Sequence, residues 1–176
     1  KKYWKNGEFR PMQKEIIEYY QSGKDVVVLL PTGGGKSICY QLPAIIQEGL
    51  TLVISPLISL MQDQVNQLNE RGIKAMFFDN NTLRNPIDHQ FDNAKYGDFK
   101  LAYLSPERLL NKSFLNQIKS LKIHGIAIDE AHCVSEWGHD FRPAFKAIKN
   151  LKQLLPGVPM IALTATATKD VLKLSL

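Results

Sequence analysis

The segment Pro31-Thr32-Gly33-Gly34-Gly35-Lys36-Ser37 combines the residue types that phosphate chemistry needs. Consecutive glycines let backbone N–H groups converge on phosphate oxygens, and a helix N-terminus adds the positive end of its dipole. In such a loop the ammonium of Lys36 reaches the β and γ phosphates of ATP, and the hydroxyl of Ser37 binds Mg²⁺. An apolar run, residues 26–30, precedes the segment and a helical pattern follows it. The sequence therefore predicts a P-loop whose turn is formed by Thr32, Gly33, Gly34 and Gly35.

A second group of reactive side chains, Asp129-Glu130-Ala131-His132, follows the apolar run 123–128. Acidic residues at the end of a buried strand, downstream of a P-loop, are the expected second half of a nucleotide site. Asp129 would hold Mg²⁺ through its water shell, and Glu130 would orient and deprotonate the attacking water. We expect His132 to link this site to a neighbouring segment by hydrogen bonding. Taken alone, the same residues also fit a helix start with acids in its first turn.

The elements that must position these residues are short apolar runs separated by stretches with helical spacing. The runs are 26–30, 52–55, 75–78, 101–105, 123–128 and 160–164, and the helical stretches include 38–47, 60–70, 114–121 and 144–155. The runs are continuous rather than alternating, as strands covered on both faces should be. This order predicts an α/β fold with a mainly parallel central sheet and helices on both faces. Ligands of such a sheet gather at the carboxyl ends of the strands.

Composition sets broad limits. The 176 residues fit a single domain, and 44% apolar with 22% charged residues is the balance of an ordinary globular protein. No apolar run approaches the ~20 residues of a membrane span, so we expect no membrane partner. Cys39 and Cys133 form neither a disulfide framework nor a Cys-x-x-Cys zinc site, which favours a cytoplasmic or otherwise intracellular location. A net charge of +5 fits a polyanion partner, although many basic proteins never bind nucleic acid.

Together the motifs resemble the RecQ family of DNA helicases over almost the whole chain. The matching segments are 9–13, 31–37, 55–61, 105–109, 129–132, 133–143 and 164–168. Segment 137–143 is the most specific, because it separates this family from other helicases with an Asp-Glu-x-His box. The P-loop has Leu30 where the strict pattern has glycine, as expected of the helicase variant. Asn6 stands where the family often places an aromatic that stacks on adenine; Trp4 or Tyr3 is the candidate substitute.

The resemblance implies an ATP- and Mg²⁺-dependent motor that moves 3′ to 5′ on single-stranded DNA, in repair or recombination. It also implies that this RecA-like domain is the first of two lobes. The second lobe would supply the arginines that complete the ATP site, so we expect this lobe alone to hydrolyse ATP poorly. Two alternatives stay open: an RNA helicase with the same core, and a P-loop module that binds without turnover. The oligomeric state is left open too.

Arg10 and Gln13 are the candidate adenine contacts. The amide of Gln13 offers a donor and an acceptor, which suits the N6/N7 edge of adenine, and Arg10 would pack beside the base or the ribose. The alternative is that both are exposed residues of a helix over 12–20. The resemblance favours adenine recognition.

The candidate DNA contacts follow the strands. Ser55-Pro56 and Ser105-Pro106 fit plain helix starts, with serine as N-cap, and the same geometry presents N–H groups to a DNA phosphate. Trp137, His139, Phe141 and Arg142 form either a stacking platform for unpaired bases or a cluster that packs the loop. The platform starts directly after His132, so we expect a stacked base to influence Glu130. Thr164 and Thr166 are candidates to bridge Glu130 or His132 to the DNA side; the alternative is a helix cap near Lys169.

Overall fold

The sheet of the protein is parallel throughout. The computed structural model describes residues 3–4, 7–79, 86–133, 142–166 and 169. Six strands pair in the order β1-β6-β5-β2-β4-β3, and every pair is parallel. They are β1 (Val26–Leu29), β2 (Leu50–Ile54), β3 (Ala75–Phe78), β4 (Leu101–Leu104), β5 (Ile123–Ile128) and β6 (Met160–Thr164). The predicted α/β class and the predicted parallel sheet are confirmed.

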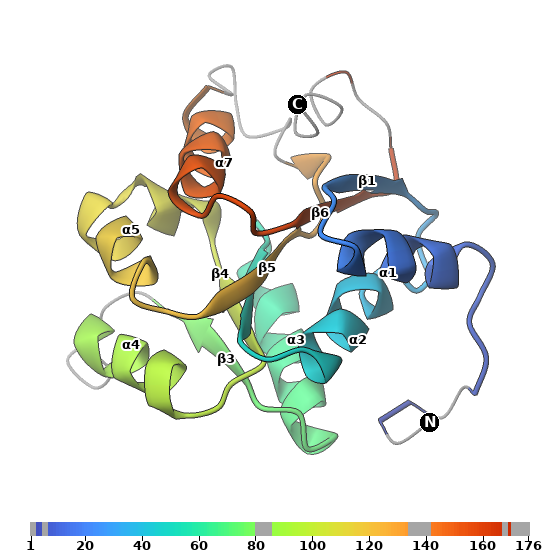
Figure 1. Cartoon of the computed structure of the whole chain (residues 1–176), viewed down its shortest axis with the longest axis horizontal. Helices are drawn as coiled ribbons and strands as arrows, with labels where there is room; N and C mark the ends of the chain where they lie inside the picture. The colour runs from blue at the N-terminus through green and yellow to red at the C-terminus, as the bar shows by residue number, and fades with distance from the viewer. Residues whose placement is uncertain (1–2, 5–6, 80–85, 134–141, 167–168, 170–176) are drawn as a thin grey trace.

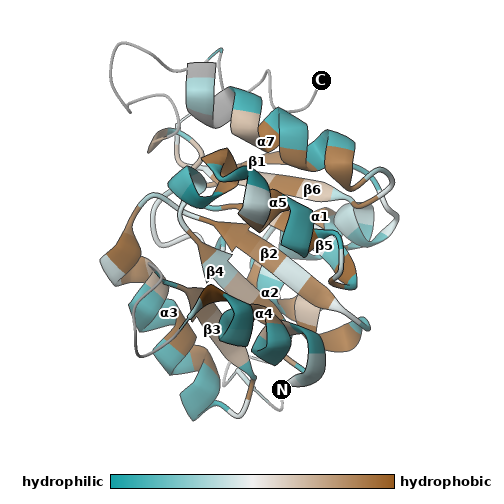
Figure 2. Ribbon diagram, turned by 90° about the vertical axis from the view of Figure 1, so that its left-hand side faces the viewer, coloured by the Kyte–Doolittle hydropathy of each residue, from teal (hydrophilic) through white to brown (hydrophobic). Residues whose placement is uncertain are grey.

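Alternate residues of the central strands enter two separate hydrophobic cores. On β2, Leu52 and Ile54 belong to one core, while Val53 belongs to the other. On β6, Ala162 belongs to the first core and Leu163 to the second. Because successive side chains point to opposite faces, a strand between two helix layers is mainly apolar on both sides. This is the physical reason that the strands are mostly apolar runs, which range from brown to pale in Figure 2.

Helices cover both faces of the sheet (Figure 1). On one face lie α1 (Gln13–Gln21), α2 (Ile38–Ile46) and α3 (Ile58–Glu70), whose buried residues share a core. On the other face lie α4 (Ile87–Tyr96), the 3₁₀ helix η1 (Pro106–Leu110), α5 (Lys112–Ile118) and α7 (Arg142–Leu154). Figure 2 shows teal and brown residues alternating along these helices, as expected of elements that bury one side.

The ends of two helices differ from the predicted ranges. We expected a helix over 114–121, but α5 begins at Lys112, because the side chain of Asn111 accepts a bond from the Phe114 N–H at 3.0 Å. We expected a helix from residue 60, but α3 begins at Ile58. The short helix predicted over 87–95 is confirmed as α4. Within the described ranges, no helix is long and apolar enough to cross a membrane.

Candidate nucleotide site

The predicted P-loop and the predicted carboxylates meet at the carboxyl edge of three neighbouring strands. Strand β6 lies between β1 and β5 in the sheet. Leu29 of β1 pairs with Thr164 of β6, and the Leu30 N–H donates to the carbonyl of Thr164 at 3.1 Å. On the other side, the Ala131 N–H donates to the carbonyl of Leu163 at 2.8 Å. The segments after β1, β5 and β6 therefore form one continuous site.

The three glycines of the P-loop are each required by the backbone. Gly33 and Gly35 have φ of 78° and 74°, a conformation that costs other residues about 1–2 kcal/mol. Gly34 would place a Cβ 2.8 Å from the carbonyl oxygen of Pro31. Among the described residues, the N–H groups of residues 35–37 meet no protein acceptor, and Ser37 occupies the N-cap position of α2. These N–H groups and the α2 dipole form a cradle for an anion.

Lys36 is half-buried at the centre of this cradle. Among the described residues it takes part in no ion pair. Its ammonium is therefore available to a phosphate group.

Gln13 and Arg10 contact the backbone of the P-loop. Gln13 is only 5% exposed; its Nε2 donates to the carbonyl of Gly35 at 3.1 Å, and its Oε1 accepts from the Arg10 N–H at 2.8 Å. The Arg10 guanidinium donates to the carbonyl of Gly33. The alternative that Gln13 is an exposed helix residue is wrong, because these bonds bury its amide against the loop. Its role toward adenine stays a prediction.

A cleft of about 510 Å³ opens beside these two residues. Its lining includes Trp4, Arg10 and Gln13, together with α3 residues such as Gln67. The Trp4 ring also packs against the guanidinium of Arg71, at 6.0 Å. Among the described residues, Trp4 therefore lines the cleft beside the P-loop, whereas Tyr3 does not.

Glu130 adopts an unusual backbone conformation. Its φ is 51°, in the left-handed region that few residues other than glycine enter. Such a conformation costs about 1–3 kcal/mol and persists at functional sites where the surroundings enforce it. Here the enforcing contacts are the bond from the Glu130 N–H to Oδ1 of Asp129 at 3.0 Å and the bond from the Cys133 N–H to the Glu130 carbonyl. The turn sends the side chain of Glu130 toward His132.

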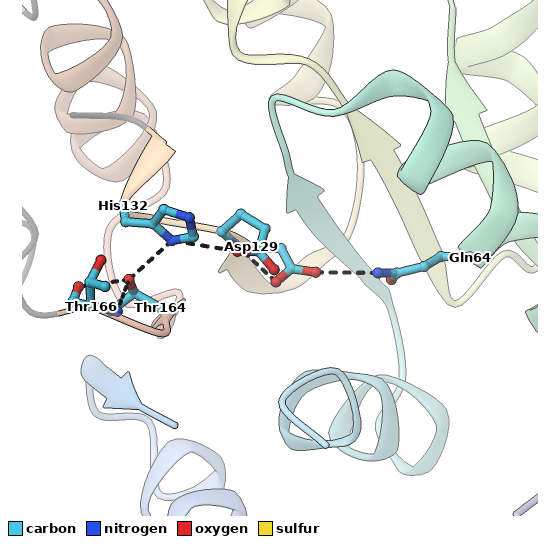
Figure 3. Close-up of polar contacts among 6 residues, drawn as sticks. Gln64, Asp129, His132, Thr164 and Thr166 are labelled. Carbon is cyan, nitrogen blue, oxygen red and sulfur yellow. Dashed lines mark hydrogen bonds and ion pairs between the residues drawn. The ribbon is translucent and has the colours of Figure 1, made fainter. Parts of the chain in front are cut away.

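His132 connects the carboxylates to the end of β6 (Figure 3). Its Nδ1 lies 3.4 Å from Oε2 of Glu130 and 3.2 Å from Oγ1 of Thr164. Thr164 Oγ1 donates to the carbonyl of Thr166 at 2.8 Å and accepts from the Thr166 N–H at 3.1 Å. Because the only proton of this hydroxyl is committed to Thr166, Thr164 accepts from His132, so Nδ1 carries a proton. The predicted link between His132 and Thr164 is present; its coupling role stays a prediction.

Comparisons with known proteins decide the family. Residues 10–174 match the family described as DEAD/DEAH box helicase. The chain belongs to the DEAD/DEAH box helicase family. It is 49% identical over 165 residues to the probable ATP-dependent DNA helicase RecS of Bacillus subtilis, and 48% identical over 159 residues to the ATP-dependent DNA helicase RecQ of Pasteurella multocida. These matches cover 94% and 90% of this chain but 33% and 25% of the relatives, so the chain spans a third of their length or less.

Solved helicases share the fold. A crystal structure of the DUF1998 helicase MrfA bound to DNA matches with a TM-score of 0.74 and 25% identity, over 93% of this chain and 25% of that one. A hypothetical ATP-dependent RNA helicase from Sulfolobus tokodaii matches with a TM-score of 0.71 and 21% identity, over 97% and 50%. The predicted RecA-like helicase fold and the similarity to RecQ proteins are confirmed.

The donor set of this helicase domain fits a phosphate-bound metal ion. Mg²⁺ in phosphate-transfer sites takes one or two protein ligands and completes its shell with phosphate oxygens and water. Ser37, at the start of α2, and Asp129, at the end of β5, offer one hydroxyl and one carboxylate. In the part of the chain that the structure describes, no group of three or more His, Cys, Asp or Glu residues gathers to hold a metal by itself. The residues present therefore suit Mg²⁺ carried by a nucleotide.

The candidate DNA contacts are only partly described. Ser55 is 2% exposed and its Oγ has no partner within the described residues; Leu57, not Ser55, occupies the N-cap position of α3. The expectation that Ser55 caps a helix with Pro56 at its first position is therefore wrong. Ser105 does occupy the N-cap position of η1, and Pro106 follows it, but the side chain of Ser105 makes no capping hydrogen bond.

The predicted stacking platform lies almost entirely outside the described residues. Trp137, His139 and Phe141 lie outside the described residues. Arg142 begins α7, and the structure does not describe its side chain. Their roles stay predictions.

Sequence reasoning missed a group of polar residues behind Asp129. Tyr40 of α2, Gln64 of α3 and Tyr103 of β4 lie within hydrogen-bond distance of one another beside the Asp129 carboxylate. Burial raises the pKa of the Tyr103 phenol to about 12 and, together with the charge of Asp129, raises the pKa of Tyr40 well above its usual range. The only sequence signal is the pair Tyr40-Gln41, which interrupts the apolar pattern of the helix after the P-loop.

Proposed function

We propose that the chain is the ATP- and Mg²⁺-binding lobe of a RecQ-like DNA helicase, which couples ATP hydrolysis to 3′ to 5′ movement on single-stranded DNA. One observation carries the proposal. An anion cradle at β1 and a carboxylate pair at β5 flank β6, and a histidine joins the pair to the hydroxyl that ends β6. The similarity to RecS and RecQ proteins supports the choice of DNA as partner.

The residues divide the chemistry among themselves. Lys36 and the N–H groups of residues 35–37 would bind the β and γ phosphates, while Ser37 and Asp129 would hold Mg²⁺. Mg²⁺ supplies charge neutralisation of the phosphates when it is bound. Glu130 would orient the attacking water and accept its proton. His132 Nδ1 lies between Oγ1 of Thr164 and Oε2 of Glu130, so movement at Thr164 would change the surroundings of the base.

Adenine recognition belongs to the cleft beside the P-loop. Gln13 and Arg10 line it together with Trp4, and both contact P-loop carbonyls. We infer that Trp4 supplies the aromatic face that the RecQ pattern places at position 6. A bound purine would then be sensed by the same side chains that hold the loop.

The rest of the motor lies outside this lobe. A second RecA-like lobe would supply arginines to the ATP site, which contribute ~10³–10⁵ in rate in related P-loop enzymes. The chain by itself should therefore bind nucleotide and hydrolyse it poorly. DNA inside the cell would contact three parts of this lobe: Ser105 with the proline after it, the N–H groups after β2, and the segment 137–142.

The test is ATP hydrolysis by the full-length protein, with and without single-stranded DNA and with single-stranded RNA as a comparison. We expect DNA to stimulate turnover more than RNA does. Lys36→Ala should abolish turnover, and Trp137→Ala should remove only the DNA stimulation. Turnover that is indifferent to DNA would refute the motor assignment and leave a nucleotide-binding module. Stimulation by RNA alone would instead assign the protein to the RNA helicases.

A further inference from the structure

A buried polar cluster surrounds the second oxygen of Asp129. Oδ2 lies 3.1 Å from the hydroxyl of Tyr40 and 3.4 Å from Nε2 of Gln64. Figure 3 shows the Gln64 contact, which joins α3 to the end of β5. Tyr103 donates to Oε1 of Gln64 at 2.9 Å, and Gln41 donates to the hydroxyl of Tyr103 at 3.3 Å. We call Tyr40, Gln41, Gln64 and Tyr103 the Asp129 cluster.

The protons of the cluster can be assigned. The Tyr40 hydroxyl has one proton and three acceptors within reach: Oε1 of Gln64 at 2.8 Å, Oδ2 of Asp129 at 3.1 Å and the Tyr103 hydroxyl at 3.5 Å. Oε1 of Gln64 already receives the proton of Tyr103. A carboxylate is the stronger acceptor, since a hydrogen bond to an ionised group is about twice as strong as a neutral one. Tyr40 therefore donates to Asp129.

These donors hold the carboxylate of Asp129 in one orientation. Oδ1 accepts from the Glu130 N–H, and Oδ2 accepts from Tyr40 and Gln64. Asp129 is only 4% exposed, so water cannot easily replace a lost donor. Rotation of the carboxylate would break bonds at both oxygens at once.

Tyr40 also connects Asp129 to the P-loop. It lies on the first turn of α2, and its N–H donates to the carbonyl of Ser37 at 3.3 Å. Tyr40 thus contacts both candidate Mg²⁺ ligands, the backbone of Ser37 and the side chain of Asp129. The Tyr40 hydroxyl therefore connects the first turn of α2, whose N-cap residue is Ser37, to the Asp129 carboxylate, and it takes no part in the proposed hydrolysis step.

We propose that Tyr40 is a positioning residue for the metal: its hydroxyl, backed by Gln64, fixes the Asp129 carboxylate so that Mg²⁺ binds with the nucleotide. This inference rests on the proposed nucleotide site and names a residue to which that site assigned no role. Groups that orient a metal ligand typically contribute 10- to 100-fold in metal affinity or activity.

The test measures nucleotide binding rather than turnover. A fluorescent non-hydrolysable ATP analogue is titrated with the full-length protein, in EDTA and at rising MgCl₂. Tyr40→Phe should raise the half-saturating Mg²⁺ concentration about 10-fold and leave the affinity in EDTA unchanged. The matched control is Tyr20→Phe: Tyr20 is 1% exposed, and its hydroxyl lies 3.5 Å from the carbonyl of Ile126, on the same strand β5 but without contact to Asp129. The control should keep the wild-type Mg²⁺ dependence.

A second comparison separates positioning from a general structural effect. In an Asp129→Asn background, Tyr40→Phe should have no further effect on the Mg²⁺ titration, because its action passes through the carboxylate. A Mg²⁺ dependence unchanged by Tyr40→Phe, or equal losses in EDTA and in Mg²⁺, would overturn the inference. If Tyr40→Phe does not fold, Gln64→Met removes the other donor and should give the same Mg²⁺-specific shift; no shift overturns the inference. A wild-type protein whose nucleotide binding ignores Mg²⁺ would instead overturn the proposed metal site.

Discussion

The P-loop glycines offer a matched pair of substitutions. Gly33 and Gly35 have nearly the same φ, 78° and 74°. A Cβ on Gly33 would meet nothing within 4 Å, whereas a Cβ on Gly35 would lie 2.5 Å from Nε2 of Gln13. Gly33→Ala therefore introduces backbone strain alone. Gly35→Ala introduces the same strain and also displaces the amide of Gln13.

The expected magnitudes follow from these contacts. The left-handed conformation costs alanine about 1–2 kcal/mol, and the stiffer unfolded chain returns about 0.4–1 kcal/mol, so Gly33→Ala should destabilise by about 1 kcal/mol. Gly35→Ala loses in addition the 3.1 Å bond from Gln13 to the Gly35 carbonyl, a further loss of about 1 kcal/mol. For an unfolding transition of a domain of this size, that difference corresponds to a Tm about 2–4 °C lower for Gly35→Ala.

Two assays check the pair in the full-length protein. Thermal unfolding gives the difference in Tm, and competition between ATP and GTP for a fluorescent nucleotide gives the base selectivity. If Gln13 recognises adenine, Gly35→Ala should lose selectivity for ATP while Gly33→Ala keeps it. Equal Tm values would refute the steric argument. Equal selectivity at unequal Tm would refute the role of Gln13 at adenine.

Three further outcomes are expected. Glu130→Gln should lower ATP turnover by about 10²–10⁴, since it removes the base, while nucleotide affinity in Mg²⁺ stays near wild type; a parallel loss of affinity would contradict that role. Met12→Gly should raise Tm by a few degrees, because Met12 has φ of 67° and glycine adopts this backbone conformation without strain. The strain removed, about 1–2 kcal/mol, exceeds the conformational entropy that glycine adds to the unfolded chain. Calorimetry measures Tm, and a lower Tm would show that the methionine side chain stabilises the fold. Thr164→Val removes the acceptor for His132 Nδ1 and should reduce DNA-stimulated ATP turnover more than basal turnover. The control Thr51→Val removes a buried hydroxyl bonded to a histidine elsewhere on the sheet, and it should leave the ratio of stimulated to basal turnover unchanged. Equal ratios in the two variants would count against coupling.

Local chemistry made much of the site predictable from the sequence. The glycine-rich turn before Lys36-Ser37 and the acidic residues directly after an apolar run are motifs of a few consecutive residues, so the sequence alone identifies them. The strands were predictable for a similar reason, because a strand buried on both faces is mainly apolar on both of them. Boundaries were harder: α5 starts two residues before its apolar pattern, where the side chain of Asn111 supplies the cap.

The burial of Gln13 shows where local pattern fails. The sequence allowed an exposed helix residue or a base contact with equal ease. The choice depends on the P-loop carbonyls, more than twenty residues further along the chain, which accept the bonds of its amide. An amide at a helix start is solvated unless tertiary structure brings it a partner.

What the sequence by itself determined is the inventory: six buried strands, helices between them, a phosphate loop and a carboxylate pair at strand ends. Only the tertiary structure decided which ends are neighbours. Strand β6, last in the described sheet, lies between β1 and β5, and this order brings Thr164 to His132. It likewise brings Tyr40 and Gln64 to Asp129 across sequence separations of 89 and 65 residues. Periodicity reports whether a residue faces a core, whereas the partner that it meets there depends on strand order, which no local pattern encodes.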